Sequence, residues 1–226
     1  MNRAPGQKAF LLTSFGCQMN LADAQRIRGI LQNLGYAEVE KEVEADLIIF
    51  NTCCVRQHAE DRFASRVQAL RGLKKHNPRL LIAVGGCIAQ KEQEKIFDAL
   101  PVIDLAFGTN DIERLPELLE RLKPGEHRIG PFAGTGVFDG EQADGVVLDR
   151  PCMAFVNIIR GCTNFCAYCI VPTVRGPEVS RPLPEIVDFV QNLVAKGVRE
   201  ITLLGQNVNA YGKDLGMEEG FATLVE

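Results

Sequence analysis

Short apolar stretches alternate with longer amphipathic stretches along the first half of the chain. The apolar stretches have the length of strands, and apolar residues recur at helical spacing between them, as at positions 27, 30, 31 and 34. We predict strands at 10–15, 45–50, 80–84 and 102–107, each followed by a helix, at 21–34, 57–75, 90–99 and 112–122. This order predicts an α/β domain whose parallel sheet is covered by helices.

The second half repeats the strand–helix–strand order once. We predict a strand at 154–159, a helix at 185–196 and a strand at 201–204, which is typical of the first βα units of an α/β barrel. Glycine is frequent between the halves and helical periodicity is missing there. The predicted organisation is an N-terminal domain at 1–124, a linker at 125–151 and the start of a barrel at 152–226.

Three cysteines of the first half occupy equivalent positions. Cys17, Cys53 and Cys87 each follow a predicted strand and precede a predicted helix. The carboxyl ends of parallel strands lie at one edge of a sheet, so three thiols that are far apart in sequence can meet there. Helix N-termini at that edge would stabilise thiolates and an anionic cluster. A single intracellular cysteine is more often a small buried apolar residue, but this reading does not account well for three at one edge.

Three further cysteines lie within eight residues of the second half. Cys162, Cys166 and Cys169 form a Cys-x3-Cys-x2-Cys motif directly after a predicted strand. A structural zinc ion takes four ligands, and no fourth cysteine or histidine is close in sequence. A four-iron, four-sulfur (4Fe-4S) cluster on three cysteines leaves one iron open to a substrate or cofactor. The motif therefore predicts a reactive cluster.

The two remaining cysteines are not predicted to be ligands. Cys54 adjoins Cys53, and the side chains of neighbouring residues diverge too much for both to ligate one group easily. Cys152 precedes the strand at 154–159, which places it at the end of that strand opposite the motif loop.

Composition indicates the cellular compartment in which this chemistry would take place. The chain has 226 residues, of which 46% are apolar, and it lacks a run of about 18 apolar residues that would cross a membrane. The first eight residues have no apolar core and do not resemble a secretory signal. We therefore expect a cytoplasmic protein, where eight cysteines favour metal binding over disulfides. The net charge of −4 does not indicate nucleic-acid binding, but a local basic face is compatible with it.

The segments around the cysteines resemble known families. The motif of Cys162, with an aromatic residue, Tyr168, before its last cysteine, resembles the radical S-adenosylmethionine (SAM) superfamily. Nearly the whole chain resembles the methylthiotransferases within it. The segments that carry this resemblance are Gly16-Cys17-Gln18-Met19-Asn20, Asn51-Thr52-Cys53-Cys54-Val55-Arg56, Gly85-Gly86-Cys87 and the residues at 174–182 and 204–212.

The resemblance implies two 4Fe-4S clusters. Cys162, Cys166 and Cys169 would hold the radical-generating cluster, whose open iron binds SAM. Cys17, Cys53 and Cys87 would hold an auxiliary cluster that carries or delivers sulfur, and a second SAM would methylate that sulfur.

The resemblance also implies a substrate and further contacts. Tyr168 would lie against the adenine of SAM, and Gln206 and Asn207 would touch SAM, although both could instead be polar caps of a strand end. The substrate would be a tRNA anticodon loop bearing isopentenyladenosine, methylthiolated at carbon 2. An electron donor of the flavodoxin or ferredoxin type and a sulfur donor would be needed, and no membrane.

Two pairs of residues favour this substrate. Relatives that act on a ribosomal protein carry Pro-Lys where Gln18-Met19 stand here, and Gly-Phe where Cys54-Val55 stand. Cys54 itself departs from the tRNA group, which usually has serine. The alternatives are a methylthiotransferase for a ribosomal protein or for threonylcarbamoyladenosine in tRNA, and a non-catalytic iron–sulfur or zinc protein.

The RNA contacts and the extent of the chain are less defined by the motifs. Arginines near the cysteine loops could meet phosphates, but each is more often paired or solvated; these are Arg56, Arg160, Arg175 and Arg181. The family continues with more barrel strands and an RNA-binding TRAM domain, which are absent here. We therefore expect an N-terminal fragment that is inactive by itself.

Overall fold

The computed structural model describes residues 4, 6–54, 57–132, 145–148 and 150–226. The chain divides into two compact units, Met1–Ala133 and Gly134–Glu226, which we describe separately. The strands of unit 1 are β1 (Ala9–Ser14), β2 (Ala37–Glu38), β3 (Leu47–Thr52), β4 (Leu81–Gly86), β5 (Leu105–Phe107) and β6 (Arg128–Ile129). Its α-helices are α1 (Gln18–Asn33), α2 (Gln57–His76), α3 (Cys87–Glu92), α4 (Lys95–Ala99) and α5 (Leu115–Glu120).

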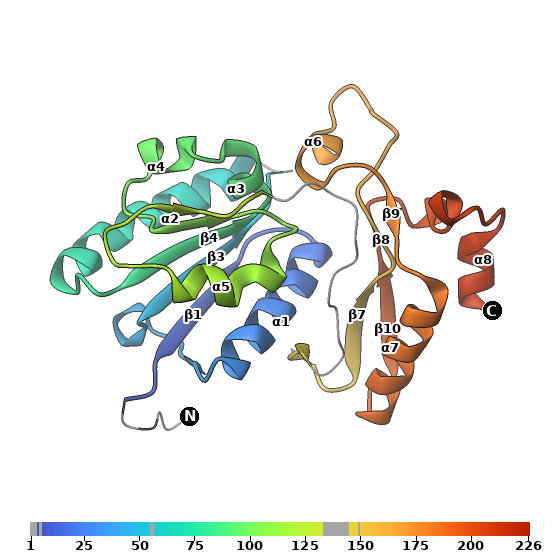
Figure 1. Cartoon of the computed structure of the whole chain (residues 1–226), viewed down its shortest axis with the longest axis horizontal. Coiled ribbons are helices and arrows are strands. Elements are labelled where there is room, and N and C mark those ends of the chain that lie inside the picture. Colours follow the sequence, from blue (N-terminus) through green and yellow to red (C-terminus); the bar gives the residue numbers. More distant parts are fainter. Residues whose placement is uncertain (1–3, 5, 55–56, 133–144, 149) are drawn as a thin grey trace. The chain divides into compact units, whose positions relative to one another are not determined.

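The strands of unit 1 form one parallel sheet in the order β2-β1-β3-β4-β5-β6 (Figure 1). All six residues of β3 are buried, which explains the continuous apolar run in a strand that is covered on both faces. The order of the first five strands is that of flavodoxin-like folds, in which the strand order reverses between β1 and β3. The predicted parallel α/β sheet is confirmed.

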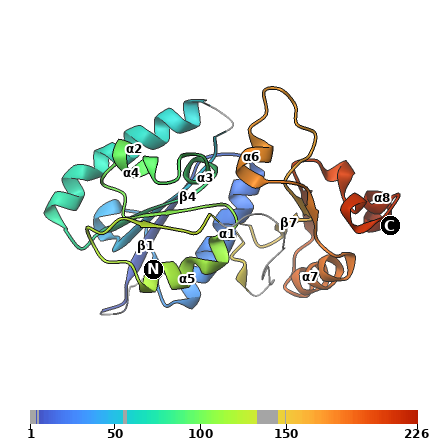
Figure 2. The ribbon, with the colours of Figure 1, turned by 45° about the horizontal axis from the view of Figure 1, so that its top comes forward.

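Helices cover both faces of this sheet (Figure 2). On one face, Phe63 and Val67 of α2 and Ile88 of α3 pack against alternate residues of β3 and β4. On the other face, Ile27 of α1 and Leu115 of α5 pack against the strand residues that point to that side of the sheet. The strands β1, β3, β4 and β5 therefore each contribute to two apolar cores, because successive side chains point to opposite faces.

A buried carboxylate fixes the start of β5. Asp104 is almost fully buried, forms an ion pair with Lys74 of α2, and accepts hydrogen bonds from the backbone N–H of Ile82 (2.8 Å) and of Gly125 (3.3 Å). One side chain thereby joins a helix, a neighbouring strand and a turn. Its burial is tolerated because its oxygens have these partners.

Unit 1 differs from the sequence prediction in several places, including β2, which was not predicted, and β5, which is shorter than the strand predicted at 102–107. The helix predicted at 90–99 is divided into α3 and α4, because Gln93 between them has a positive φ of 50°. The helix predicted at 112–122 begins with a 3-10 turn, Ile112–Arg114. The sheet extends past residue 124, since β6 pairs with β5 inside the segment predicted to be a linker. Short strands such as β2 and β6 carry too few residues to show a period.

Unit 2 contains the predicted strand–helix–strand element. Its strands are β7 (Met153–Asn157), β8 (Ile159–Arg160), β9 (Val179–Ser180) and β10 (Glu200–Leu204), and its α-helices are α6 (Val171–Arg175), α7 (Leu183–Ala195) and α8 (Gly220–Val225). β7 and β10 are parallel, and α7 packs Ile186, Phe189 and Leu193 onto them. The predicted strand at 154–159 turns after Asn157, and β8 pairs antiparallel with β9.

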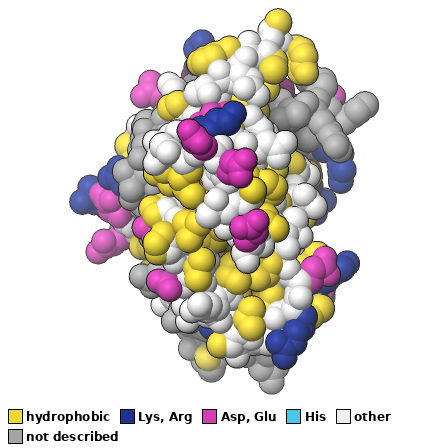
Figure 3. Space-filling view, turned by 90° about the vertical axis from the view of Figure 1, so that its right-hand side faces the viewer, with side chains coloured by type: hydrophobic (Ala, Val, Ile, Leu, Met, Phe, Trp, Pro, Cys, Tyr) yellow, Lys and Arg dark blue, Asp and Glu magenta, His cyan; other side chains and the backbone are white. Residues whose placement is uncertain are grey.

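Apolar side chains remain exposed on unit 2. Figure 3 shows them gathered on the side that carries α7 and α8, where Val187, Val194 and Val225 are exposed. Among the described strands, β10 pairs with β7 alone, so its other edge is open. None of the helices in the described part of the chain has both the length and the apolar character needed to cross a bilayer.

Candidate cluster sites

The first three cysteines lie around the point where the strand order reverses. Cys17 is the N-cap residue of α1, Cys53 directly follows β3, and Cys87 is the first residue of α3 after β4. The chain leaves β1 toward one edge of the sheet and leaves β3 toward the other. Such a divergence opens a crevice at the carboxyl ends of the strands, where ligands bind in open α/β sheets.

Two glycines let these loops approach each other closely. A Cβ on Gly16 would lie 2.6 Å from the Cβ of Cys53, so only glycine fits there. A Cβ on Gly86, which has φ +93°, would lie 2.4 Å from the carbonyl oxygen of Thr52. The loops that carry Cys17, Cys53 and Cys87 are therefore in contact, as the placement of the strand ends predicted.

Two buried asparagines hold the loops after β1 and β3 together. The side-chain Nδ2 of Asn20 donates to the carbonyl oxygen of Thr52 (2.8 Å), and that of Asn51 donates to the carbonyl oxygen of Asn20 (2.7 Å). The Oδ1 of Asn20 accepts from the Cys17 thiol (3.2 Å). Asn20 is fully buried and Asn51 nearly so. The sequence motifs contained both residues, but nothing in their spacing indicated that they contact each other.

Thr52 connects this pair to the third loop. Its hydroxyl donates to the carbonyl oxygen of Gly85 (2.7 Å) and accepts from the backbone N–H of Ile88 (3.3 Å). The first hydrogen bond holds the end of β4 and the second holds the first turn of α3. The position of Cys87 relative to Cys53 is thereby set by one buried hydroxyl group.

Cys54 lies nearer to this site than the sequence suggested. Its side chain forms a hydrogen bond with Cys87, and this bond, together with partial burial, raises the pKa of the Cys54 thiol. A raised pKa keeps the thiol protonated, which is the inert form of cysteine. Cys152 is exposed and directly precedes β7, as predicted.

The three thiols differ in their exposure to solvent. Cys53 and Cys87 are buried and Cys17 is exposed, so a group held between them would be sheltered on the protein side and open on the other. A single zinc ion needs its sulfur ligands packed around one tetrahedron. Within the described residues, no group of three or more metal-binding side chains is close enough to hold a metal ion. In a 4Fe-4S cluster each cysteine is instead bound to an iron atom of its own.

The second cysteine loop follows β8 in unit 2. Gly161 has φ +75°, and a Cβ there would lie 1.9 Å from the carbonyl oxygen of Pro177, so this position also requires glycine. The backbone N–H of Cys162 donates to the carbonyl oxygen of Gly176 (3.0 Å), which ties the start of the loop to the end of α6. Cys162 is buried, while Cys166 is exposed.

A turn brings the last two cysteines of the loop together. The backbone N–H of Cys169 donates to the carbonyl oxygen of Cys166 (2.9 Å), and Cys169 is half-buried. Phe165, just before this turn, has φ +46° and is exposed. A non-glycine residue in the left-handed region carries strain, and such strain is frequent at functional sites.

The three other predicted contact residues lie in different surroundings. The side-chain Oε1 of Gln206 accepts from the backbone N–H of Gly161 (2.5 Å), so Gln206 holds the cysteine loop from the end of β10. Asn207 is partly buried and precedes a 3-10 turn, Val208–Ala210. Tyr168 is 94% exposed. Its ring is available to a ligand and makes little contact with the protein.

Two of the arginines suggested for RNA phosphates are buried instead. Arg181 lies with its guanidinium 4.5 Å from the centre of the Phe189 ring, and Arg175 is equally inaccessible. The suggestion is wrong for these two, because both side chains are used in the packing of unit 2. Arg160 is partly buried, and Arg56 lies outside the described residues.

Comparison with known proteins assigns each half of the chain. Residues 9–108 match the model of the uncharacterized protein family UPF0004, and residues 156–222 match that of the radical SAM superfamily. The second half of the chain is therefore similar to the radical SAM superfamily. The two matched regions each contain one of the three-cysteine sets. The radical SAM region contains Cys162, Cys166 and Cys169.

Several curated relatives align with both regions of this chain. Proteins named tRNA-2-methylthio-N(6)-dimethylallyladenosine synthase are 44% identical in Clostridium novyi, 46% in Clostridium tetani and 43% in Carboxydothermus hydrogenoformans. These alignments cover 96 to 97% of the chain but 48 to 50% of each relative. The chain thus spans about half the length of the relatives it matches. The resemblance to methylthiotransferases is confirmed.

A solved structure has a similar fold. The radical SAM methyltransferase TsrM from Kitasatospora setae, solved with tryptophan and a SAM analogue, superposes with a TM-score of 0.59 over 96% of this chain and 50% of its own. At 12% identity this similarity concerns the fold alone.

Proposed function

We propose that this protein is an enzyme that adds a methylthio group to carbon 2 of isopentenyladenosine beside the anticodon of tRNA. The observation that carries the proposal is the pair of three-cysteine sets, the first at the carboxyl ends of parallel strands and the second directly after β8, each inside one of the matched regions. The name of the relatives, tRNA-2-methylthio-N(6)-dimethylallyladenosine synthase, describes this product.

The two sets would each hold a 4Fe-4S cluster. Cys162, Cys166 and Cys169 would bind the cluster that works with SAM, and the set in unit 1 would bind the auxiliary cluster through Cys17, Cys53 and Cys87. When bound, these groups would supply one-electron chemistry together with the sulfur and methyl of the product.

The residues of unit 1 would hold the auxiliary cluster in a rigid position. Asn20 and Thr52 connect the loops, so their cysteines are placed before a cluster binds. Cys17 stands at the N-terminus of α1, whose first turn has no acidic residue. The positive end of the helix dipole then favours a thiolate and an anionic cluster.

The residues of unit 2 would orient SAM beside its cluster. Gln206 fixes the start of the cysteine loop, and the exposed ring of Tyr168 can lie against the adenine. Asn207, next to Gln206, would contact SAM from the end of β10. Parallel-strand ends in barrel enzymes carry the reactive groups in the same way.

The proposed reaction needs partners outside the chain. The substrate would be the anticodon loop of a tRNA with isopentenyladenosine. A flavodoxin-like or ferredoxin-like protein would supply electrons, and a separate donor would supply sulfur. No step of the proposed reaction involves a membrane.

Iron content tests the two clusters. After anaerobic reconstitution we expect about eight irons per chain, four for each cluster. Cys53→Ala and Cys162→Ala should each lose about half of the iron. The matched control is Cys152→Ala, which changes an exposed cysteine outside both sets and should keep all of it. Zinc in place of iron, or full iron in both test variants, contradicts the proposal.

The product tests the substrate. The reconstituted full-length protein, with SAM, a reductant and a sulfur source, should convert tRNA bearing isopentenyladenosine to the methylthio form, detected by mass spectrometry of nucleosides. Unmodified tRNA should give no product. Product on a ribosomal protein or on threonylcarbamoyladenosine instead would contradict the assignment.

A further inference from the structure

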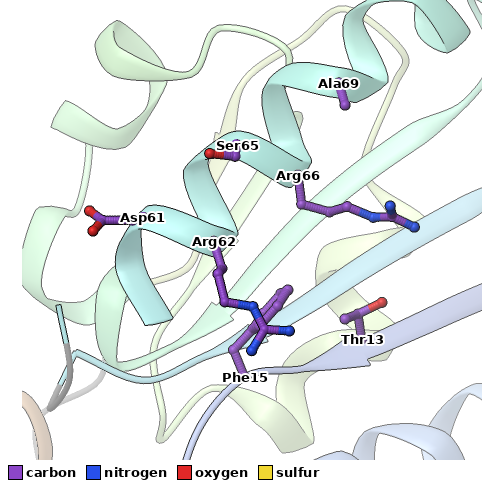
Figure 4. Close-up of a pocket in the computed structure, with 7 residues that line it drawn as sticks. All are labelled: Thr13, Phe15, Asp61, Arg62, Ser65, Arg66 and Ala69. Carbon is purple, nitrogen blue, oxygen red and sulfur yellow. The ribbon is translucent and has the colours of Figure 1, made fainter. Parts of the chain in front are cut away.

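A groove in unit 1 lies next to the loop of Cys17. It has a volume of about 590 Å³ and lies between the end of β1 and the face of α2 (Figure 4). Its lining residues are Thr13, Phe15, Asp61, Arg62, Ser65, Arg66 and Ala69. We call it the Arg62 groove. Its volume is within the usual range of small-ligand sites, about 300–1,000 Å³.

Two aromatic rings and an arginine lie at one end of the Arg62 groove. The rings of Phe50 and Phe15 are stacked with centres 6.2 Å apart, and the guanidinium of Arg62 lies 5.7 Å from the centre of the Phe15 ring. Figure 4 shows Arg62 reaching from α2 to Phe15. Arg62 is exposed, so the face of its guanidinium that is turned away from the ring is accessible. Unpaired RNA bases stack on aromatic rings and on arginine planes of this kind.

The charges of the groove favour an anion at this end. Arg66 is paired with Glu42 at 2.8 Å, whereas Arg62 contacts an uncharged ring. The carboxylate of Asp61 points away from Phe15 (Figure 4). Beyond Thr13 a second hollow is lined by three carboxylates and two cations, so its net charge is less favourable to phosphates; these residues are Glu38, Glu40, Glu44, Lys41 and Arg66. The favourable part is therefore the end of the groove at Arg62.

The position of the groove links it to the proposed chemistry. Phe15 is separated from Cys17 by Gly16 alone, so a base bound at Phe15 and Arg62 would lie next to the loop proposed to hold the auxiliary cluster. Single-stranded RNA is bound elsewhere by the same combination of stacking and positive charge.

We propose that the Arg62 groove binds one unpaired nucleotide of the substrate RNA that flanks the modified adenosine. The base stacks on the guanidinium of Arg62 over Phe15, and the phosphate faces the positive charge of the same side chain. This inference rests on the proposed function, because it takes tRNA as the substrate.

Binding of an anticodon stem–loop tests the groove. The reconstituted protein is titrated with a fluorescent stem–loop RNA bearing isopentenyladenosine, at several salt concentrations. Arg62→Ala should weaken binding about tenfold and reduce the salt slope by about one. Arg62→Lys, which keeps the charge and loses the plane, should keep the salt slope with intermediate affinity. The matched control is Arg71→Ala, an exposed arginine of α2 outside the groove, which should bind like the wild type.

The outcomes separate the groove from the proposed function. If Arg62→Ala binds RNA like Arg71→Ala, or if the wild type binds no stem–loop, the groove proposal is wrong. If Arg62→Ala binds normally while the full-length protein makes the methylthio product, the groove alone is wrong. If binding depends on Arg62 but the full-length protein makes no product, the groove proposal stands and the proposed function is wrong.

Discussion

Removing the side chain of Asn20 should destabilise unit 1 and its cluster loops together. Asn20→Ala deletes the donor to the carbonyl oxygen of Thr52 and the acceptor of the Cys17 thiol. Asn20 is fully buried, so water cannot easily replace these partners. The hydrogen bond that Asn51 donates to the backbone at position 20 would remain between the loops after β1 and β3, whereas the one donated by the Asn20 side chain would be lost.

The size of the effect follows from these contacts. Depriving a buried carbonyl of its donor costs about 1–3 kcal/mol, and the loss of the weaker thiol contact adds a few tenths. Alanine has a higher helix propensity than asparagine, which offsets about 0.5 kcal/mol of this loss in stability. The net loss is about 2 kcal/mol, which for a unit of this size lowers the melting temperature by roughly 6–10 °C.

Thermal unfolding followed by circular dichroism measures this loss in the apo protein, and iron content after reconstitution measures its effect on the cluster. The matched control is Asn33→Ala, an exposed asparagine near the end of the same helix. It should melt within about 2 °C of the wild type and keep its iron. If Asn20→Ala melts and retains iron as Asn33→Ala does, Asn20 does not hold the loops and the reasoning is wrong.

Three further predictions concern other contacts. Gly16→Ala places a Cβ 2.6 Å from that of Cys53 and should lose about half of the iron, whereas Gly72→Ala, in open space on α2, should keep the iron and raise stability by about 0.5–1 kcal/mol in urea unfolding. Lys74→Met leaves the carboxylate of Asp104 buried without its cation and should cost about 3 kcal/mol in urea unfolding, and an unchanged midpoint would contradict this role. Burial, with the nearby charge of Asp214, raises the pKa of Tyr211 above its usual 10, so the folded state keeps a proton that the unfolded state releases. This contribution to the free energy of unfolding is complete below pH 10 and is lost as the pH rises through the pKa of the folded state. When unfolding is measured at a series of alkaline pH values, the stability of Tyr211→Phe should therefore fall less with pH than that of the wild type.

The groove and the asparagine pair were not visible in the sequence for a common reason. Arg62 and Phe15 belong to different elements, as do Asn20 and Asn51, and each residue alone is an ordinary member of a helix or loop. Their contacts arise from the packing of α2 and the loops around β1 and β3. A local pattern contains no information about such pairs unless the register of the strands is known.

The predicted linker also contains structure that local sequence patterns do not reveal. Its glycines and lack of periodicity predicted an unstructured connection from residue 125, yet β6 extends the sheet there by pairing with β5. A strand of two residues is stabilised by its neighbour's backbone and not by its own side-chain pattern. The break of the helix at Gln93 is likewise a local conformation that helix propensity does not reveal.

The sequence by itself determined the parallel α/β architecture, the strand-end positions of Cys17, Cys53 and Cys87, and the family resemblance of the motif at Cys162. It could do so because strand and helix periods and motif spacings are local properties of the chain. Only the tertiary structure decided how closely the loops approach, which side chains connect them, and where Arg62 lies. Those features depend on the order and register of the strands, which bring residues more than thirty positions apart into contact.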